Sequence, residues 1–157
     1  MKFTIIKDLS QDSMMKPILS GLLLFTILYL LSDIIVKHNS FGVLPNAIEM
    51  TLFGNEEEFL EGMGKTLFLE FWHVEIFFIM MVVFISSTIY TRLSNASKSA
   101  VVIVNIMMIS SMISLISLPI AYFLSSYFIS VYAVTFFIWH FLALYISLFS
   151  IKRLYYA

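Results

Sequence analysis

The chain has 157 residues, of which 61% are hydrophobic and 17% aromatic, and its mean hydropathy is +0.97. Soluble domains use about 45–50% apolar residues, so the composition predicts an integral membrane protein that contacts the lipid bilayer. The formal net charge of −1 and the lack of a large basic patch exclude nucleic-acid binding. The absence of cysteine excludes disulfides, zinc–thiolate sites and iron–sulfur clusters.

The order of apolar and polar segments predicts one membrane domain over residues 1–157. Residues 1–16 mix apolar and charged side chains, which is typical of an interfacial tail. Residues 37–66 form the only long polar connection. Apolar runs of membrane-spanning length predict an all-α fold, a bundle of four transmembrane helices over 18–36, 67–90, 100–123 and 128–149.

Two short helices are expected in the connection over residues 37–66. The first would begin at Pro45, since proline suits the first helical position, and would stop at Gly54. The second would begin after Asn55, with Glu58 three residues later completing a cap. Their apolar side chains predict that they lie as a lid across one mouth of the bundle.

The distribution of charge predicts the orientation. Acidic residues dominate the connection over 37–66, whereas the basic residues elsewhere fall on the opposite side of a four-span layout. By the positive-inside rule, both termini are then cytoplasmic and the lid is extracytoplasmic. The small size and the Ile/Phe/Ser-rich composition suggest a prokaryotic inner membrane. The residues on the basic side are Lys2, Lys7, Lys16, Arg92, Lys98, Lys152 and Arg153.

Small residues recur along one face of the third span, at spacings that bring two helix backbones close together in lipid. A tight turn after this span predicts an antiparallel hairpin with the fourth. Trp139 is expected to face lipid or a neighbouring subunit, because it is adjacent to an inward His140. The small residues are Ser110, Ser114, Ser117, Ala121 and Ser125.

Glu70 and His73 form an E-x-x-H pair near the outer end of the second span, where both side chains share a helix face. The same pairing supplies metal ligands in four-helix di-metal proteins, but there it occurs twice and here once. The alternative is that both residues are hydrated by the headgroup region and have no ligand.

His140 is near the middle of the fourth span, and no Asp, Glu, Lys, Arg or other His lies between Phe128 and Phe149. Ala133, His140 and Ser147 share a face at seven-residue steps, so the imidazole should point into the bundle. Three interpretations remain open. The imidazole is neutral and bonded to a serine of the third helix, or it binds haem or metal, or it exchanges protons or ions.

The two histidines differ in expected depth. His73 is about 28 Å from the inner end of its span and His140 about 18 Å, at about 1.5 Å per residue. A bis-histidine haem b site on His73 and His140 therefore needs tilt to close the gap of about 10 Å. His38 is an alternative partner for His73. A divalent metal would use Glu70, His73, His140 and His38.

Two acidic residues have simpler interpretations. Asp33 is expected to pair with Lys37 one turn later. Glu75 lies about 200° around its helix from His73, at the 100° per residue of an α helix, so the two cannot face one site. Glu75 would then pair with Lys65 or Lys37.

Three classes of function are compatible with the sequence. The first is a small redox or metal protein with His73 and His140 as ligands. The second is an oligomeric carrier or channel for ions or small solutes, and the third an accessory subunit that packs in a larger membrane complex. Self-association is open. The sequence contains no phosphate-binding glycine loop, nucleophile elbow or H-E-x-x-H motif, which argues against an enzyme.

Overall fold

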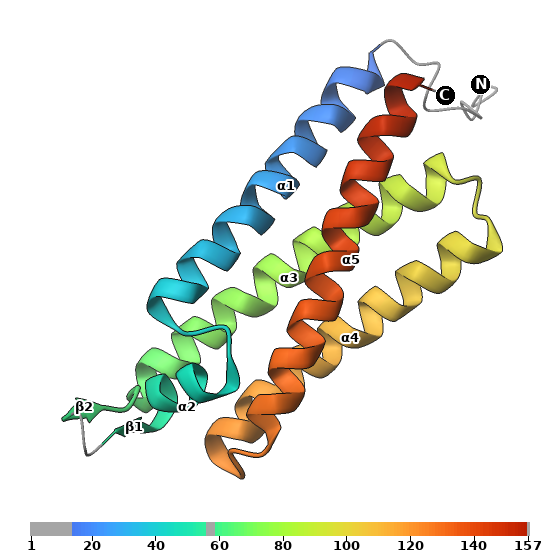
Figure 1. Cartoon of the computed structure of the whole chain (residues 1–157). Coiled ribbons are helices and arrows are strands. Elements are labelled where there is room, and N and C mark those ends of the chain that lie inside the picture. Colours follow the sequence, from blue (N-terminus) through green and yellow to red (C-terminus); the bar gives the residue numbers. More distant parts are fainter. Residues whose placement is uncertain (1–13, 56–58, 157) are drawn as a thin grey trace.

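The computed structural model describes residues 14–55 and 59–156. These residues form five helices and one hairpin (Figure 1). The hairpin lies between α2 and α3, and each of its two strands has two residues. The order is α1 (Met15–Ser40), α2 (Pro45–Phe53), β1 (Gly54–Asn55), β2 (Leu60–Glu61), α3 (Lys65–Leu93), α4 (Lys98–Phe123) and α5 (Phe128–Tyr156).

Four of the described helices, α1, α3, α4 and α5, are long and apolar enough to cross a membrane. They contain 26, 29, 26 and 29 residues. They confirm the predicted number of long apolar spans. α1, α3 and α5 begin or end several residues outside the predicted ranges. The predicted tail falls mostly on residues 1–13, which lie outside the described residues.

The four long helices run alternately up and down (Figure 1). One end of the bundle carries the start of α1, the end of α3, the start of α4 and the end of α5. We call it the basic end because Lys16, Arg92, Lys98, Lys152 and Arg153 lie there. The other end, which carries α2 and the hairpin, is the α2 end.

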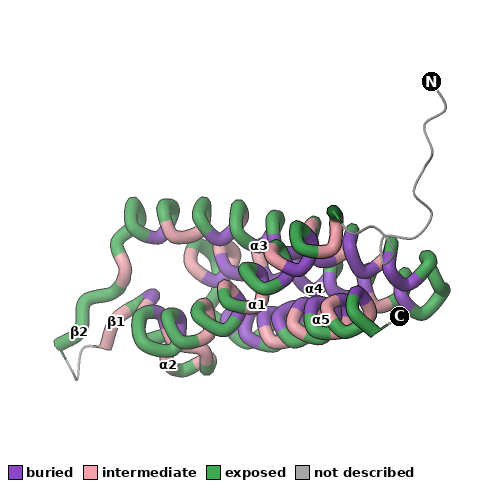
Figure 2. The backbone as a smooth tube through the Cα atoms, turned by 90° about the horizontal axis from the view of Figure 1, so that it is seen from above, coloured by how far each residue is buried: buried purple, intermediate pink, exposed green. Residues whose placement is uncertain are grey.

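α5 is the central helix of the bundle, since α1, α2, α3 and α4 all contact it. Figure 2 shows buried residues where helices face each other and exposed residues on the outer sides. Trp139 is fully buried, so the prediction that it faces lipid or a neighbouring subunit is wrong. Helices surround α5 on several sides, and its buried face is therefore wide enough to enclose Trp139 and His140 together.

The small residues of α4 are buried as the sequence predicted. Ser110, Ser114, Ser117 and Ala121 are all inside the bundle, whereas Ser125 is exposed in the turn before α5. α4 and α5 form the most extensive helix pair of the fold. Small side chains allow this close approach. In lipid the hydrophobic effect does not drive helices together, so close packing stabilises the pair instead.

α2 follows the predicted boundaries, with Pro45 in its first turn and Gly54 after its last residue. It packs through Ile48 and Leu52 onto a cluster that includes Phe68 of α3 and Leu118 of α4. Gly42 allows the turn before α2. Its φ is +88°, and a Cβ there would meet the Cβ of Ala47 at 2.7 Å.

The prediction of a second short helix after Asn55 is wrong, because the residues described there form a hairpin and no helix. β1 pairs with β2 in an antiparallel register, with Gly54 opposite Glu61 and Asn55 opposite Leu60. Gly54 has a φ of +81°, and a Cβ on Gly62 would meet the Phe53 carbonyl carbon at 2.7 Å. The two glycines permit a close backbone approach that outweighs the helix-capping pattern.

Candidate functional site: a buried ionic centre

Charged side chains from α1 and α3 meet inside the α2-end half of the bundle. Lys37 Nζ lies 2.7 Å from Glu75 Oε2 and 3.3 Å from Asp33 Oδ2. The exposed fractions of the three side chains are 4%, 7% and 10%, respectively. The expected Asp33–Lys37 pair is confirmed, and Glu75 takes Lys37 rather than Lys65, whose Nζ lies 6.0 Å from the Phe123 ring centre.

His140 of α5 completes this group. Its side chain is 1% exposed, and its Nε2 lies 2.8 Å from the backbone oxygen of Leu30 in α1. A carbonyl oxygen can only accept, so Nε2 must carry the hydrogen and donate it. Nδ1 therefore faces Asp33 Oδ2, 3.8 Å away. We call Asp33, Lys37, Glu75 and His140 the ionic centre.

Aromatic rings enclose the ionic centre. Lys37 Nζ lies 4.4 Å from the centre of the Phe136 ring, a cation–π distance, and the same ring lies 5.0 Å from the His140 ring. Tyr132 is buried one turn away, in edge contact with Phe41. These rings and the low exposure of the charged side chains place the ionic centre in a medium less polar than water, where charges interact more strongly.

Two buried polar atoms of the ionic centre and one beside it have no hydrogen bond to any described residue. They are Asp33 Oδ2, His140 Nδ1 and the hydroxyl of Tyr132. Asp33 Oδ2 is within ion-pair distance of Lys37, but the geometry is not that of a hydrogen bond. Buried polar atoms are normally satisfied, so each of these three atoms can still take a hydrogen-bond partner.

The charges of the ionic centre do not balance. With both carboxylates ionised, Lys37 protonated and the imidazole neutral, one negative charge is left over. Burying an uncompensated charge costs several kcal/mol, and charges inside a membrane protein normally face a partner or a water-filled path. The arrangement can therefore accept one positive charge, and a proton on the Asp33–His140 pair supplies it without needing extra volume.

The structure does not bring the predicted ligands together. His73, Glu70 and His38 all have exposed side chains, whereas His140 is enclosed. Within residues 14–55 and 59–156, no group of three or more His, Asp or Glu side chains could hold a metal ion. The haem or metal site on these residues remains a prediction from the sequence, and no contact of the described residues supports it.

The buried acidic residue of α3 is not the one that the sequence singled out. The sequence favoured Glu70 and His73 and placed Glu75 at the outer boundary of the span, whereas Glu75 is buried. A signal was present, because Glu75 shares a helix face with Ile79 and Val82, both of which are buried. The Asp33–Lys37 pair in the preceding span supplies its cationic partner.

Comparisons with protein-family models, with curated proteins and with solved structures found no match to this chain.

Proposed function

We propose that this small membrane protein carries protons across the bilayer, alone or coupled to a solute, and that the ionic centre holds the transferred proton. The observation that carries the proposal is the contact between His140 Nδ1 and Asp33 Oδ2 at 3.8 Å. Because Nε2 donates to Leu30, Nδ1 presents a lone pair to a carboxylate oxygen. The two atoms repel unless one of them is protonated.

A proton suits the ionic centre better than a metal ion does. Nε2 of His140 is engaged by a backbone carbonyl, and Glu75 is engaged by Lys37 at 2.7 Å. A divalent ion would need these same groups as ligands. Imidazole exchanges protons near neutral pH, so protonation of Nδ1 and its transfer to Asp33 require no change of ligand set.

The elements packed around His140 bring few other titratable groups to it. α1 contributes Asp33, Lys37 and Tyr29, α3 contributes Glu75, and α5 contributes Tyr132. The titratable side chains of α4, Lys98 and Tyr122, are near its two ends. The protonation state of the His140–Asp33 pair is therefore governed chiefly by the Lys37–Glu75 pair beside it.

Buried hydroxyls lie between the ionic centre and the basic end, the first of them about 10 Å along α5 from His140. Ser147 lies seven residues after His140 on α5, and its Oγ is 3.4 Å from that of Ser86 on α3. Ser150 is fully buried one turn further on. Hydroxyl groups both donate and accept, so this row supports a route by which a proton leaves the ionic centre.

Replacing His140 with glutamine is expected to remove most of the proton flux. The glutamine amide can still donate to the Leu30 carbonyl, so the fold is kept while the exchangeable nitrogen is lost. Protein in liposomes loaded with a pH-sensitive dye would be given a potassium diffusion potential. Proton uptake should fall by about a hundredfold, a common effect of removing a positioned acid–base group.

His73→Gln is the matched control, since His73 is exposed on the outside of α3. Its proton flux should equal that of the unmodified protein. Equal flux for His140→Gln and the unmodified protein would refute the proposal, and so would unmodified protein that conducts no faster than empty liposomes. The second result would favour a non-transporting accessory subunit, in which the ionic centre only holds α1, α3 and α5 together.

We also propose that the basic end faces the cytoplasm of a prokaryotic cell and the α2 end faces outward, which the positive-inside rule supports. Because the chain lacks cysteine, single cysteines report orientation cleanly. Asn46→Cys at the α2 end should react with a membrane-impermeant maleimide on intact cells. Ser99→Cys at the basic end should react only after the cells are opened. The reverse pattern would show the opposite orientation.

A further inference from the structure

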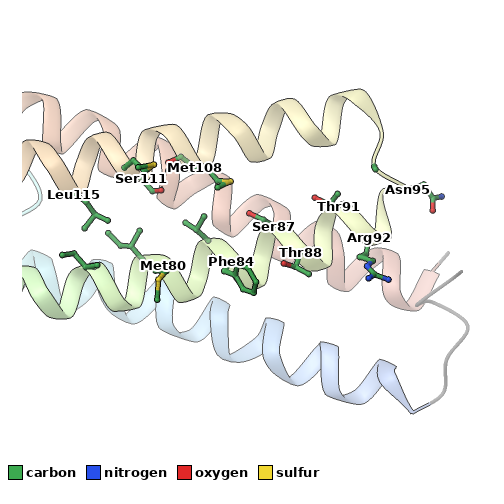
Figure 3. A pocket seen from close by; sticks show the side chains of 15 residues that line it. Met80, Phe84, Ser87, Thr88, Thr91, Arg92, Asn95, Met108, Ser111 and Leu115 are labelled. Carbon is green, nitrogen blue, oxygen red and sulfur yellow. Dashed lines mark hydrogen bonds between the residues drawn. The ribbon is translucent and has the colours of Figure 1, made fainter. Parts of the chain in front are cut away.

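A groove between α3 and α4 opens toward the lipid, separate from the ionic centre. It has a volume of about 910 Å³. Its labelled residues come from α3, from α4 and from the loop between them, with Arg92 and Asn95 together at the basic end (Figure 3). We propose that this groove binds one phospholipid of the leaflet on the basic side.

The groove is polar at one end and, apart from Ser111, mainly apolar along the rest. Thr88, Thr91, Arg92 and Asn95 lie at the basic end. Toward the middle of the membrane the walls are aliphatic, aromatic and thioether side chains, including Ile76, Ile79, Met80, Val83, Phe84, Met112 and Leu115. A phospholipid has this same sequence of a charged headgroup, polar ester linkages and hydrocarbon.

The length of the groove fits a lipid of one leaflet rather than a helix of another protein. From Arg92 to Ile76 the groove runs about 24 Å at 1.5 Å per residue. A bilayer with its headgroups is about 40–45 Å thick, so one leaflet takes about 20–22 Å. A partner helix that crosses the membrane would need a groove along both leaflets.

Contacts between α3 and α4 close the groove on the side of the α2 end. Trp72 Nε1 donates to the backbone oxygen of Leu115 at 2.8 Å, and the Phe68 and Tyr122 rings stack at 4.0 Å. The helix pair is therefore joined at the α2 end and separated toward the basic end. The occupant must enter from the basic-side leaflet.

One charged group of the groove is available to the occupant. Among the residues that the structure describes, Arg92 has no carboxylate within ion-pair distance. Its guanidinium can bind a phosphate through two N–H groups. The groove continues from Arg92 toward the middle of the bundle, where a lipid chain would pack against its apolar walls.

The test is native mass spectrometry of the full chain, delipidated and then titrated with dioleoyl phosphatidylglycerol. One lipid should bind per chain. Arg92→Gln should weaken binding about tenfold, a typical effect of losing a charge-assisted hydrogen bond. Thr88→Trp should also weaken lipid binding, because the indole would occupy part of the groove. Thr88 is exposed, so this change should leave the core undisturbed.

Lys98→Gln is the matched control, since it removes one positive charge from the same end at a residue that does not line the groove. Its affinity for the lipid should be unchanged. Equal weakening in Lys98→Gln and Arg92→Gln would mean attraction by net charge alone and would overturn the proposal. A disulfide-linked dimer of Thr88→Cys at high yield would also overturn it, because a second copy would then occupy the groove.

Discussion

Lys37→Met is expected to destabilise the protein by about 3–5 kcal/mol, the range measured when one partner of a buried ion pair is removed. Lys37 is the only cation that contacts Asp33 and Glu75 within the described residues. Without it, two carboxylates face each other in an enclosed site. The measurement is an SDS-titration of unfolding in mixed micelles, followed by circular dichroism, in which the midpoint should shift to a lower SDS fraction.

The double variant Lys37→Met/Glu75→Leu should recover part of the lost stability, since apolar replacement of a buried pair is often neutral but Asp33 still lacks its cation. Lys65→Met is the control, because Lys65 is exposed, and it should change the midpoint little. A Lys37→Met protein as stable as the unmodified one would contradict the enclosure of the ionic centre. In liposomes, the double variant distinguishes the structural role of the ionic centre from its role in proton transfer. It should fold but lose proton flux.

Trp139→Ala is expected to cost about 3 kcal/mol, the lower end of the range for a buried Trp in a soluble core. Trp139 is fully buried and lies against Phe136 and His140, with ring centres 5.8 and 5.0 Å away. Lipid supplies little hydrophobic driving force, so the loss comes from the cavity and the missing packing contacts. The same SDS titration measures it.

Phe141→Ala provides the comparison, because Phe141 is adjacent in the sequence but 58% exposed. Its aromatic ring contacts lipid or detergent both in the folded and in the unfolded state. The free energy of unfolding should therefore change by less than about 0.5 kcal/mol. If both variants lost equal stability, Trp139 would be no more enclosed than Phe141. The face of α5 that carries Trp139 would then not be its buried face.

The positions of the long helices were predictable because the signal is local. Each apolar run is long enough to span a membrane, and polar residues separate it from the next. The start of α2 at Pro45 and its stop at Gly54 were predictable for the same reason, since proline and glycine restrict their own backbone. The hairpin after α2 was not, because its strands depend on a pairing between separate segments.

The faces of the long helices were much harder to predict. In a soluble protein, apolar periodicity marks the buried side, but in a membrane both the buried and the lipid-facing residues are apolar. Only polar residues then distinguish the faces. His140 and the serines of α4 were placed correctly for this reason, while Trp139 was not. The Lys37–Glu75 contact joins residues 38 positions apart and depends on how α1 and α3 align.

The central position of α5 has a consequence for biosynthesis. α5 leaves the ribosome after α1, α3 and α4, so these three enter the membrane before the helix that all of them contact. During that interval His140 is absent, and Lys37 and Glu75 can already neutralise each other, since both belong to earlier helices. The early pairing lets charged segments leave the translocon before the last helix arrives.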